Sequence, residues 1–282
     1  MSHPPAILRT ISDLRAHSAS WHSEGLTVGM IPTMGALHEG HLALVAEARR
    51  RVDRIVATIF VNPTQFAPTE DFGAYPRTEA SDVAKLAAIG VEAVFAPNAA
   101  EMYPPGHATT LSLAGPALEL ETAFRPHFFS GVATVVAKLL IGGFPDIAVF
   151  GEKDYQQLLV VRQMVRDLHL PTDIIGLPTI READGLALSS RNAYLSADER
   201  RTAPRLAAAM RAAAANIRGG GVVAEALASA MAEITAAGFR PDYLELRNAE
   251  TLAHPVPGSG EPLRLLAAAW LGKTRLIDNM AV

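Results

Sequence analysis

The 282-residue sequence contains no cysteine, and this absence removes two classes of protein from consideration. Without thiols the chain forms no disulfide and offers no thiolate ligand to a metal ion. It also lacks a hydrophobic run of the roughly 18 residues that a membrane-spanning helix needs, and its first twenty residues lack the apolar core of a signal peptide. We therefore expect a soluble cytoplasmic protein with no membrane partner.

Basic clusters are missing as well. The chain carries 25 lysine and arginine residues against 29 aspartate and glutamate residues, for a net charge of −4, with no basic block. Nucleic-acid-binding surfaces are strongly basic, so we expect no nucleic-acid partner. Hydrophobic residues make up 49% of the sequence and charged residues only 19%, which is ample for one large or two unequal packed domains.

The first two-thirds of the sequence alternates apolar runs with segments of helical spacing. The apolar runs are rich in β-branched residues and predict buried strands at residues 27–33, 54–61, 93–97, 146–150 and 173–180. Helical spacing occurs at residues 41–52, 78–90 and 155–168. This alternation predicts an α/β fold with a Rossmann-like, doubly wound parallel sheet.

The pattern changes from about residue 189 onward. Two alanine-rich helical segments are separated by the glycine triplet at residues 219–221, and strand-like segments follow them. Helices followed by strands are typical of a separate α+β domain. We therefore expect a larger domain at residues 1–184 and a smaller C-terminal α+β domain at residues 185–282.

The motif "PTMGALHEGH" follows the first of these predicted strands. Gly35 and Gly40 permit a close approach of the backbone, and His38 and His41 can share one face at the start of a helix. The motif fits a solvated helix start, half of a metal site, or a phosphate site made by imidazoles and a helix N-terminus. No third ligand is spaced nearby to complete a metal site.

Three further polar motifs occur where predicted strands end. Asn62 and Gln65 in "FVNPTQF" offer neutral amides to a ligand, or form an Asn-Pro turn. Lys153 in "FGEKDYQQL" precedes a predicted helix, where a lysine is unfavourable unless an anion lies there too. The motif "GLALSSRN" offers hydroxyl and guanidinium donors to a polyphosphate, or a helix cap and a surface arginine.

The carboxyl ends of parallel strands meet at one edge of a sheet, so these four motifs together predict a polyanion site. Two absences narrow the type of site. The sequence contains no GxxxxGK(S/T) motif, so the protein is not a P-loop enzyme. It contains no GxGxxG after the first predicted strand, which disfavours a dinucleotide-dependent dehydrogenase.

Five motifs resemble, in order and approximate spacing, those of the pantothenate synthetase family, the pantoate–β-alanine ligases. They are "PTMGALHEGHLAL", "FVNPTQF", "YPRT", "GEKDYQQL" and "DGLALSSRN". The resemblance covers nearly the whole chain, and the His-x-Gly-His element is also similar to the HIGH motif of the wider nucleotidyltransferase superfamily.

The resemblance implies a two-step reaction. Pantoate would attack the α-phosphorus of ATP to give pantoyl adenylate and pyrophosphate, and the amine of β-alanine would then displace AMP to give pantothenate. It further implies Mg²⁺ as the companion of ATP and a homodimeric enzyme. The larger domain would bind ATP and pantoate, and the smaller one would act as a lid.

The same resemblance assigns residues to the site. It implies that ATP is bound by Met34, Gly35, Ala36, Leu37, His38, Glu39, Gly40, His41, Gly151, Glu152, Lys153, Asp154, Ile180, Leu188, Ser189, Ser190 and Arg191. Among these, His38, His41 and Lys153 would be catalytic through donors and charge placed at the phosphates. Gln65 and Gln157 would bind the substrates pantoate and β-alanine. The metal ligands stay open, with Asp82 and Asp154 as candidates.

One segment departs from the family pattern Arg-Pro-x-His-Phe-x-Gly-Val. The chain reads "RPHFFSGV" from Arg125, so that Phe128 stands where the family has histidine. We expect Phe128 to be a packing or substrate-gating residue and do not expect His127 to replace the histidine. The alternatives to a ligase are another nucleotidyltransferase, such as a cytidylyltransferase, and a nucleotide-sensing binding module.

Overall fold

The computed structural model describes residues 4–66 and 71–282. Contacts divide the chain into two compact units, which we call unit 1 and unit 2. Unit 1 comprises Met1–Gly151 and Val160–Leu177, and unit 2 comprises Glu152–Leu159 and Pro178–Val282. The expected domain boundary at residues 184 and 185 stays a prediction about which parts fold independently.

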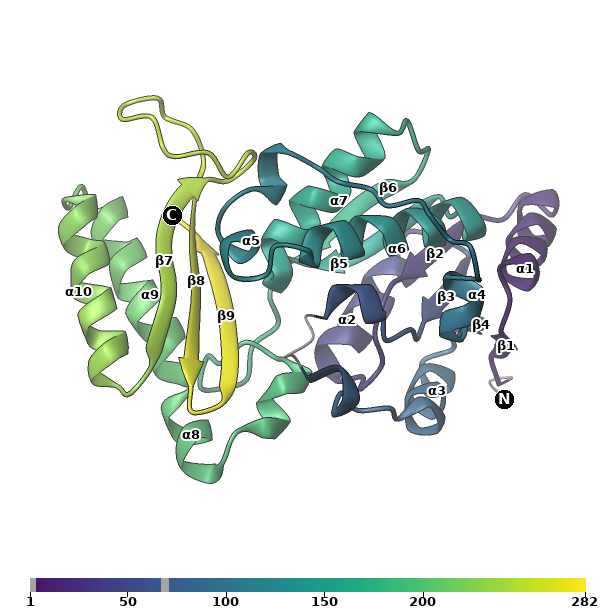
Figure 1. Ribbon diagram of the computed structural model, residues 1–282, viewed down its shortest axis with the longest axis horizontal. Coiled ribbons are helices and arrows are strands. Elements are labelled where there is room, and N and C mark those ends of the chain that lie inside the picture. The colour runs from purple at the N-terminus through teal and green to yellow at the C-terminus, as the bar shows by residue number, and fades with distance from the viewer. Residues whose placement is uncertain (1–3, 67–70) are drawn as a thin grey trace. The chain divides into compact units, whose positions relative to one another are not determined.

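Unit 1 contains a six-stranded sheet in the order β1-β4-β3-β2-β5-β6, in which all neighbouring strands are parallel (Figure 1). The strands are β1 (Ala6–Leu8), β2 (Val28–Ile31), β3 (Arg54–Thr58), β4 (Ala93–Phe95), β5 (Ile147–Gly151) and β6 (Asp173–Leu177). Every residue of β2 and β4 is buried, as their β-branched and apolar composition predicts. This confirms the doubly wound parallel sheet.

The helices of this part of the chain lie between or beside the strands in sequence. They are α1 (Ile11–Ser23), α2 (Glu39–Arg49), α3 (Glu79–Ala88), α4 (Ala99–Met102), α5 (Glu121–Phe124), α6 (Phe128–Gly143) and α7 (Tyr155–Asp167). Short 3-10 helices are η1 (Pro63–Gln65), η2 (Asp71–Gly73), η3 (Gly115–Ala117) and η4 (Glu152–Asp154). The residues that separate the strands therefore form the helical connections that parallel pairing requires.

The order of the strands creates a switch point between β2 and β5. From β2 the chain proceeds through β3 to β4 on one side, and it then returns to β5 and β6 on the other side of β2. Ligands of open α/β sheets are bound outside the carboxyl ends of the strands at such a point. The motif that contains His38 and His41 follows β2 directly.

Unit 2 contains a three-stranded antiparallel sheet and three helices. The strands are β7 (Arg240–Asn248), β8 (Leu263–Leu271) and β9 (Thr274–Ala281), in the order β7-β8-β9. The helices are α8 (Ala197–Thr202), α9 (Pro204–Arg218) and α10 (Val223–Ala236), with the 3-10 helix η5 (Ser190–Tyr194) before them. This confirms the smaller C-terminal α+β part.

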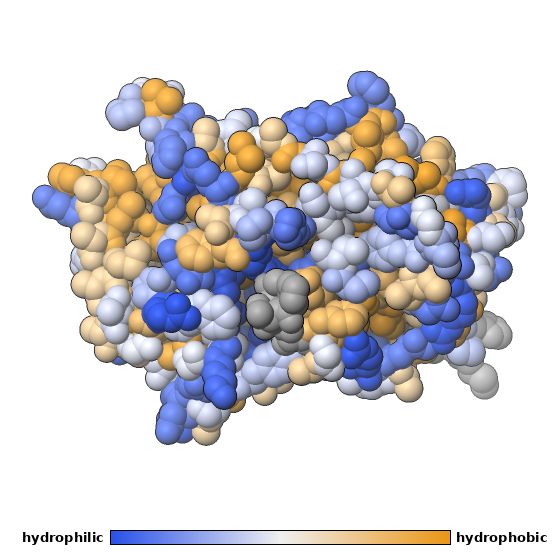
Figure 2. Space-filling model, viewed as in Figure 1, coloured by the Kyte–Doolittle hydropathy of each residue, from blue (hydrophilic) through white to orange (hydrophobic). Residues whose placement is uncertain are grey.

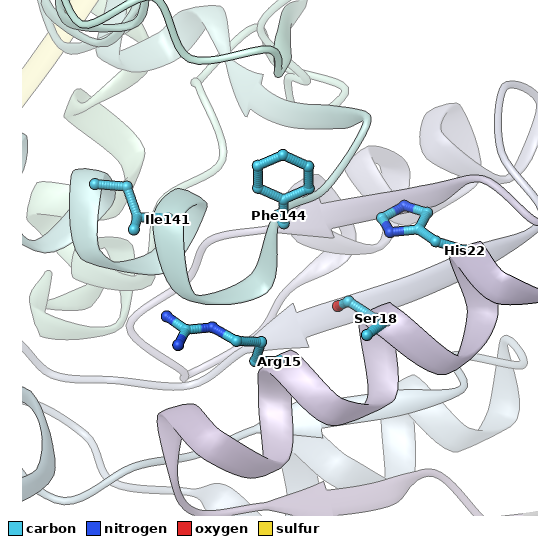
Figure 3. A pocket seen from close by; sticks show the side chains of 6 residues that line it. Arg15, Ser18, His22, Ile141 and Phe144 are labelled. Carbon is cyan, nitrogen blue, oxygen red and sulfur yellow. The ribbon is translucent and has the colours of Figure 1, made fainter.

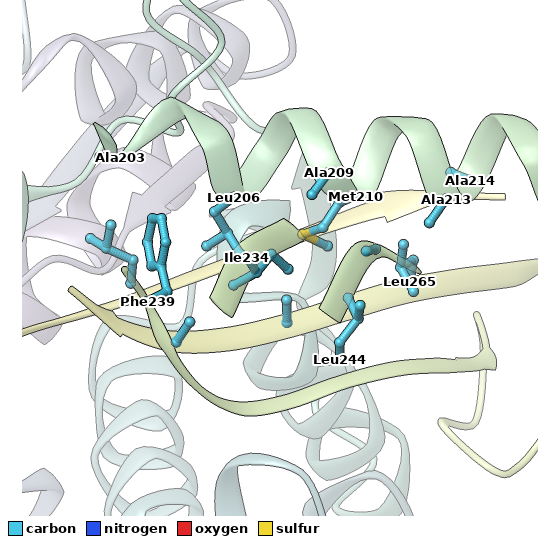
Figure 4. Close-up of a cluster of buried hydrophobic side chains, with 14 of the residues drawn as sticks. Ala203, Leu206, Ala209, Met210, Ala213, Ala214, Ile234, Phe239, Leu244 and Leu265 are labelled. Carbon is cyan, nitrogen blue, oxygen red and sulfur yellow. The ribbon is translucent and has the colours of Figure 1, made fainter. Parts of the chain in front are cut away.

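A hydrophobic core joins the helices of unit 2 to its sheet. Leu206 and Met210 of α9 and Ile234 of α10 lie against Leu244 of β7 and Leu265 of β8 (Figure 4). Alanines at other inward positions keep α9 and α10 close together. The surface over α9 and α10 is also largely hydrophobic because of this alanine content (Figure 2).

A pocket of about 210 Å³ lies between α1 and α6 in unit 1 (Figure 3). It is lined by Arg15, Ser18, Ala19, His22, Ile141 and Phe144. None of these residues belongs to the motifs that predict the polyanion site. Across the described residues, no helix is both long enough and apolar enough to cross a membrane.

The helix α6 approaches η1 at Gly131, and this close contact generates a prediction. A Cβ at position 131 would overlap the backbone carbonyl of Thr64, which cannot move without shifting η1. We predict that Gly131→Ala lowers the free energy of unfolding by about 1–3 kcal/mol through overpacking. Alanine's better helix propensity, about 1 kcal/mol, would act in the opposite direction.

The control is Gly142→Ala in the same helix, where the nearest atom is the end of the Ile11 side chain at 3.0 Å. Because that side chain can move, we expect a change within about 1 kcal/mol. Urea denaturation measures both variants. Equal stability of Gly131→Ala and the unmodified protein would contradict the packing at η1.

Candidate active site

The two histidines of the first motif cap the N-terminus of α2. His38 is the N-cap residue in an extended conformation, and its Nδ1 accepts a hydrogen bond from the Gly40 N–H at 3.1 Å. The Nδ1 of His41 accepts in turn from the His38 N–H at 3.3 Å. A neutral imidazole whose Nδ1 is an acceptor carries its proton on Nε2. Both rings therefore have an Nε2–H group as their donor.

The two imidazole rings also lie together, as their spacing predicts. Their centroids are 4.1 Å apart and their planes are tilted by 42°. The positive end of α2 is at the same place, so backbone and imidazole donors converge there. Such a helix start attracts an anion, and a phosphate is the anion that it most commonly binds.

The backbone before His38 turns sharply and is held by a buried carboxylate. Gly35 and Ala36 have φ angles of 84° and 52°, in the left-handed region. Asp82 of α3 is 0% exposed and accepts hydrogen bonds from the Ala36 and Leu37 N–H groups, each at 2.9 Å. The Thr78 hydroxyl donates a third, also at 2.9 Å. Asp82 thus anchors the turn, which removes it as a metal-ligand candidate.

Asn62 and Gln65 lie together after β3, but only Gln65 is placed to act on a ligand. Asn62 is 1% exposed, and its Nδ2 donates to Gln65 Oε1 at 2.9 Å and to the Gly131 carbonyl at 3.2 Å. Its Oδ1 accepts from the Tyr103 hydroxyl at 2.8 Å. Because the Gln65 oxygen is held by Asn62, its Nε2–H₂ group is the end left to donate.

Tyr103 is a residue that the sequence did not single out. Burial raises the pKa of its hydroxyl, which therefore stays protonated and donates to Asn62. Its separation from Asn62 by 41 positions leaves no local signal of this contact. Tyr103 and Asn62 together fix the orientation of Gln65.

The departure at position 128 proves to be a packing contact. The guanidinium carbon of Arg125 lies 3.7 Å from the centroid of the Phe128 ring, as in a cation–π interaction. Arg125 also donates to the Gln65 carbonyl at 3.1 Å. Phe128 meets Phe129 edge-on with centroids 5.0 Å apart, while His127 is exposed. Phe128 therefore supports Arg125 beside the residue proposed to bind substrate.

In unit 2, Lys153 lies in η4 immediately before α7, as the sequence predicts. Its side chain is 19% exposed, and its Nζ is 3.8 Å from Asp154 Oδ1. Gln157 follows in the first turn of α7 and is partly buried. A cation at the N-terminus of a helix is unfavourable by itself. The position of Lys153 before α7 is therefore consistent with the predicted binding of an anion there.

The segment with the two serines forms a hairpin in unit 2. Arg181 pairs with Ala187 in an antiparallel bridge, and the Leu188 N–H donates to the Ile180 carbonyl at 3.0 Å. The structure thus brings Ile180 beside the segment from Leu188 to Arg191. Ser189 is the N-cap residue of η5, and its hydroxyl oxygen accepts a hydrogen bond from the Arg191 N–H at 3.2 Å.

Ion pairs made by two arginines hold this hairpin. Arg181 donates to both carboxylate oxygens of Asp278, at 2.7 and 2.8 Å, and these bonds raise the pKa of the Arg181 guanidinium. Arg200 of α8 donates to Asp184 at 2.6 Å. That pair lowers the pKa of the Asp184 carboxyl. Neither partner could be predicted from the sequence, since Asp278 and Arg200 lie 97 and 16 positions from the residues they bind.

A Rossmann-like sheet with phosphate-type donors at its switch point defines the class of protein as a nucleotide-binding α/β enzyme. Comparison with known proteins gives the family. The profile of the pantoate–β-alanine ligase family matches residues 6–281. The chain belongs to the pantoate–β-alanine ligase family.

Individual relatives agree with this over their full lengths. The pantothenate synthetase of Caulobacter vibrioides is 59% identical over 281 residues, which cover 99% of each chain. The crystal structure of pantothenate synthetase from Thermus thermophilus superposes with a TM-score of 0.89 at 48% identity, covering 98% of each chain. That of the ligase from Francisella tularensis, complexed with beta-gamma ATP and β-alanine, gives a TM-score of 0.83 at 32% identity, covering 98% and 97%.

The anchoring of the turn by Asp82 generates a second prediction. In Asp82→Asn an amide N–H₂ group would face either the Ala36 N–H and the Thr78 hydroxyl or the Leu37 N–H. Loss of a charged acceptor from buried donors costs about 1.5–3 kcal/mol, so we expect that decrease in the free energy of unfolding. Chemical denaturation measures it.

Glu79→Gln in the same helix is the matched control. Glu79 forms an ion pair with Arg9 and its side chain is 45% exposed, so its loss should change stability by less than about 1 kcal/mol. A stability of Asp82→Asn equal to that of Glu79→Gln would show that Asp82 does not anchor the turn.

Proposed function

We propose that the chain carries out its family's reaction, the ATP-dependent ligation of pantoate and β-alanine, and that its donors to the phosphates of ATP are the following. In unit 1 the donors are His38, His41 and the backbone from Met34 to Leu37. In unit 2 they are Lys153, Ser189, Ser190 and Arg191. The observation that carries the proposal is the pair of imidazoles that lie together at the start of α2, with the Nδ1 atom of each turned to a backbone N–H group.

The first step in this proposal is adenylation. An oxygen of the pantoate carboxylate forms a bond to the α-phosphorus of ATP, and the bond from that phosphorus to the bridging oxygen of pyrophosphate breaks. Negative charge then grows on the leaving pyrophosphate. The Nε2–H groups and the ammonium group of Lys153 stabilise that charge without themselves changing protonation state, which is the main form of catalysis in phosphoryl chemistry.

The second step forms the amide. The amine of β-alanine attacks the acyl carbon of pantoyl adenylate, and AMP leaves with the oxygen that pantoate contributed. A carboxylate by itself is a poor electrophile, whereas its mixed anhydride with AMP carries a good leaving group. The amine must be neutral to attack, so it loses protons in the course of this step.

Neutral amides suit the binding of pantoate. We assign this role to Gln65 and Gln157, since an amide donor orients a carboxylate without neutralising its charge and so leaves it nucleophilic. The hydrogen bond from Asn62 to Gln65 Oε1 supports the assignment, because it leaves the Gln65 N–H₂ group to donate. Arg125 donates to the backbone of Gln65 and belongs to the same group of residues.

We propose that Mg²⁺ enters together with ATP. Mg²⁺ is usually bound through substrate phosphates and one or two carboxylates. Asp154 is the carboxylate that fits, because its side chain is 46% exposed while Asp82 is occupied by backbone donors. The ion would supply positive charge to the phosphates. Among the described residues no group of three or more candidate ligands is assembled.

We also propose that the enzyme is cytoplasmic and homodimeric. The absence of cysteine supports the first part, because it suits a reducing compartment. The resemblance to a typically dimeric family supports the second.

The order of the two steps gives the test of the proposed function. Adenylation precedes any contact with β-alanine, so pantoate alone should support the exchange of labelled pyrophosphate into ATP. The control reaction omits pantoate and should show no exchange. A strict requirement of the exchange for β-alanine would contradict the stepwise reaction.

The role of Lys153 gives a separate prediction. We expect Lys153→Ala to slow pyrophosphate exchange by about two to three orders of magnitude, as the loss of a transition-state donor worth about 3–4 kcal/mol does. The thermal midpoint should change little. Lys273→Ala, at the exposed turn between β8 and β9, is the matched control and should exchange at the normal rate. A normal rate in Lys153→Ala would remove Lys153 from the phosphate site.

A further inference from the structure

The C-terminal strand β9 holds both of the phosphate-binding segments of unit 2. Its neighbouring residues Asp278 and Asn279 are 5% and 3% exposed, so both are polar groups buried within the unit. β9 contacts η4, which contains Lys153, and η5, which contains Arg191. Buried polar side chains need partners, and the partners of these two lie in the segments that carry the proposed donors.

The side-chain amide of Asn279 is hydrogen-bonded to η4 and to Arg264, which supports η4. The Nδ2 group donates to the backbone carbonyl of Glu152 at 2.8 Å and to that of Lys153 at 2.9 Å. Its Oδ1 accepts from Nε of Arg264 on β8, also at 2.8 Å. One side chain thus fixes two successive peptide groups, including the one that belongs to Lys153.

Arg264 completes the contact from β8. Its second guanidinium nitrogen donates to the Glu152 carboxylate at 2.9 Å, and its guanidinium carbon lies 3.9 Å from the centroid of the Tyr155 ring. The residues on both sides of Lys153–Asp154 are therefore held through their side chains, while Asn279 holds the backbone between them. The Lys153 side chain itself forms the ion pair with Asp154, at 3.8 Å.

Asp278 serves the other donor segment. Its carboxylate accepts two hydrogen bonds from Arg181, at the base of the hairpin that leads to Ser189, and it also accepts one from the Asn279 N–H at 2.7 Å. Asp278 and Asn279 are adjacent and hydrogen-bonded to each other. Two neighbouring residues of β9 therefore hold both η4 and the hairpin.

We propose that Asn279 is a positioning residue for adenylate formation, which acts by holding the backbone of Glu152 and Lys153 so that the Lys153 ammonium group is aimed at the phosphates. The proposal rests on the proposed role of Lys153. A lysine side chain has four rotatable bonds, and the position of its backbone sets the region that its charge can reach. A displacement of about 1 Å at a group that stabilises the transition state can cost about 100-fold in rate.

A double-mutant cycle tests the proposal, with the steady-state kcat and KM for ATP in pyrophosphate exchange as the readout. Asn279→Ala removes both donors, and we expect kcat to fall about 10- to 100-fold. In a Lys153→Ala background the same change should reduce kcat by less than about threefold, because residues that act through one another are not additive. A purely structural role for Asn279 would give independent, multiplying losses.

A second variant keeps the shape of the side chain. Asn279→Asp retains an acceptor for Arg264 but sets a carboxylate oxygen against the carbonyls of Glu152 and Lys153. We expect kcat to fall at least as far as in Asn279→Ala, since repulsion replaces the two donated bonds. This variant is assayed in the same cycle, so that the proposal does not depend on the folding of one protein.

Asn248→Ala is the matched control for the loss of a buried asparagine in unit 2. Asn248 of β7 is 9% exposed; it donates to Glu261 at 2.6 Å and accepts from the N–H groups of Glu250 and Thr251. We expect its thermal midpoint to fall as in Asn279→Ala, with kcat changed by less than about threefold because its partners carry no proposed donor.

The outcomes separate the two proposals. A near-normal kcat in Lys153→Ala would remove the proposed role of Lys153, whatever Asn279 does. A slow Lys153→Ala combined with a normal Asn279→Ala, or with losses that multiply in the double variant, would overturn the positioning role alone. Failure of both Asn279 variants to fold would also overturn it, because the residue would then be structural.

Discussion

The hydrogen bonds that the Asp82 carboxylate accepts from the backbone N–H groups of Ala36 and Leu37 are the interaction on which the first set of donors depends. The turn before α2 uses two left-handed residues, and a backbone of that kind needs a fixed partner to stay in one conformation. Asp82 of α3 provides this partner through its buried carboxylate. The His38 cap and the His41 ring then follow at a defined position, where an anion meets donors that need no rearrangement.

In unit 2 the backbone beside the proposed donor is held by the side-chain amide of Asn279 instead of a carboxylate. The backbone carbonyl groups of Glu152 and Lys153, beside the proposed phosphate donor, need hydrogen-bond donors, and Asn279 supplies two. In both units a buried polar side chain from a distant element fixes the backbone, while the side chains proposed to bind the ligand are partly buried. The proposed catalytic groups are thus few, and the residues that hold their backbone, Asp82 and Asn279, are buried and lie far from them in sequence.

The separation between the proposed ligand-binding side chains and the buried side chains that hold the backbone explains which features the sequence could predict. The parallel sheet was predictable because buried strands are short β-branched runs, and the donor motifs were predictable because glycine, histidine and lysine stand beside strand ends. The helix α6 was missed because it is apolar on nearly all sides and has no clear helical period. No motif in the sequence marks Asn279 or Tyr103. The sequence indicates Asp82 only as a metal-ligand candidate, because its partners in the turn are 46 and 45 positions away.

The chemistry of the first step is the central claim, and the fate of the pantoate oxygens tests it most directly. Pantoate labelled with ¹⁸O in its carboxylate is incubated with ATP and β-alanine, and the nucleotide product is analysed by mass spectrometry. Attack on the α-phosphorus predicts AMP that carries one ¹⁸O atom, together with unlabelled pyrophosphate. Label in inorganic phosphate with ADP as the nucleotide product would indicate attack on the γ-phosphorus, and that result would contradict the adenylation assigned to this site.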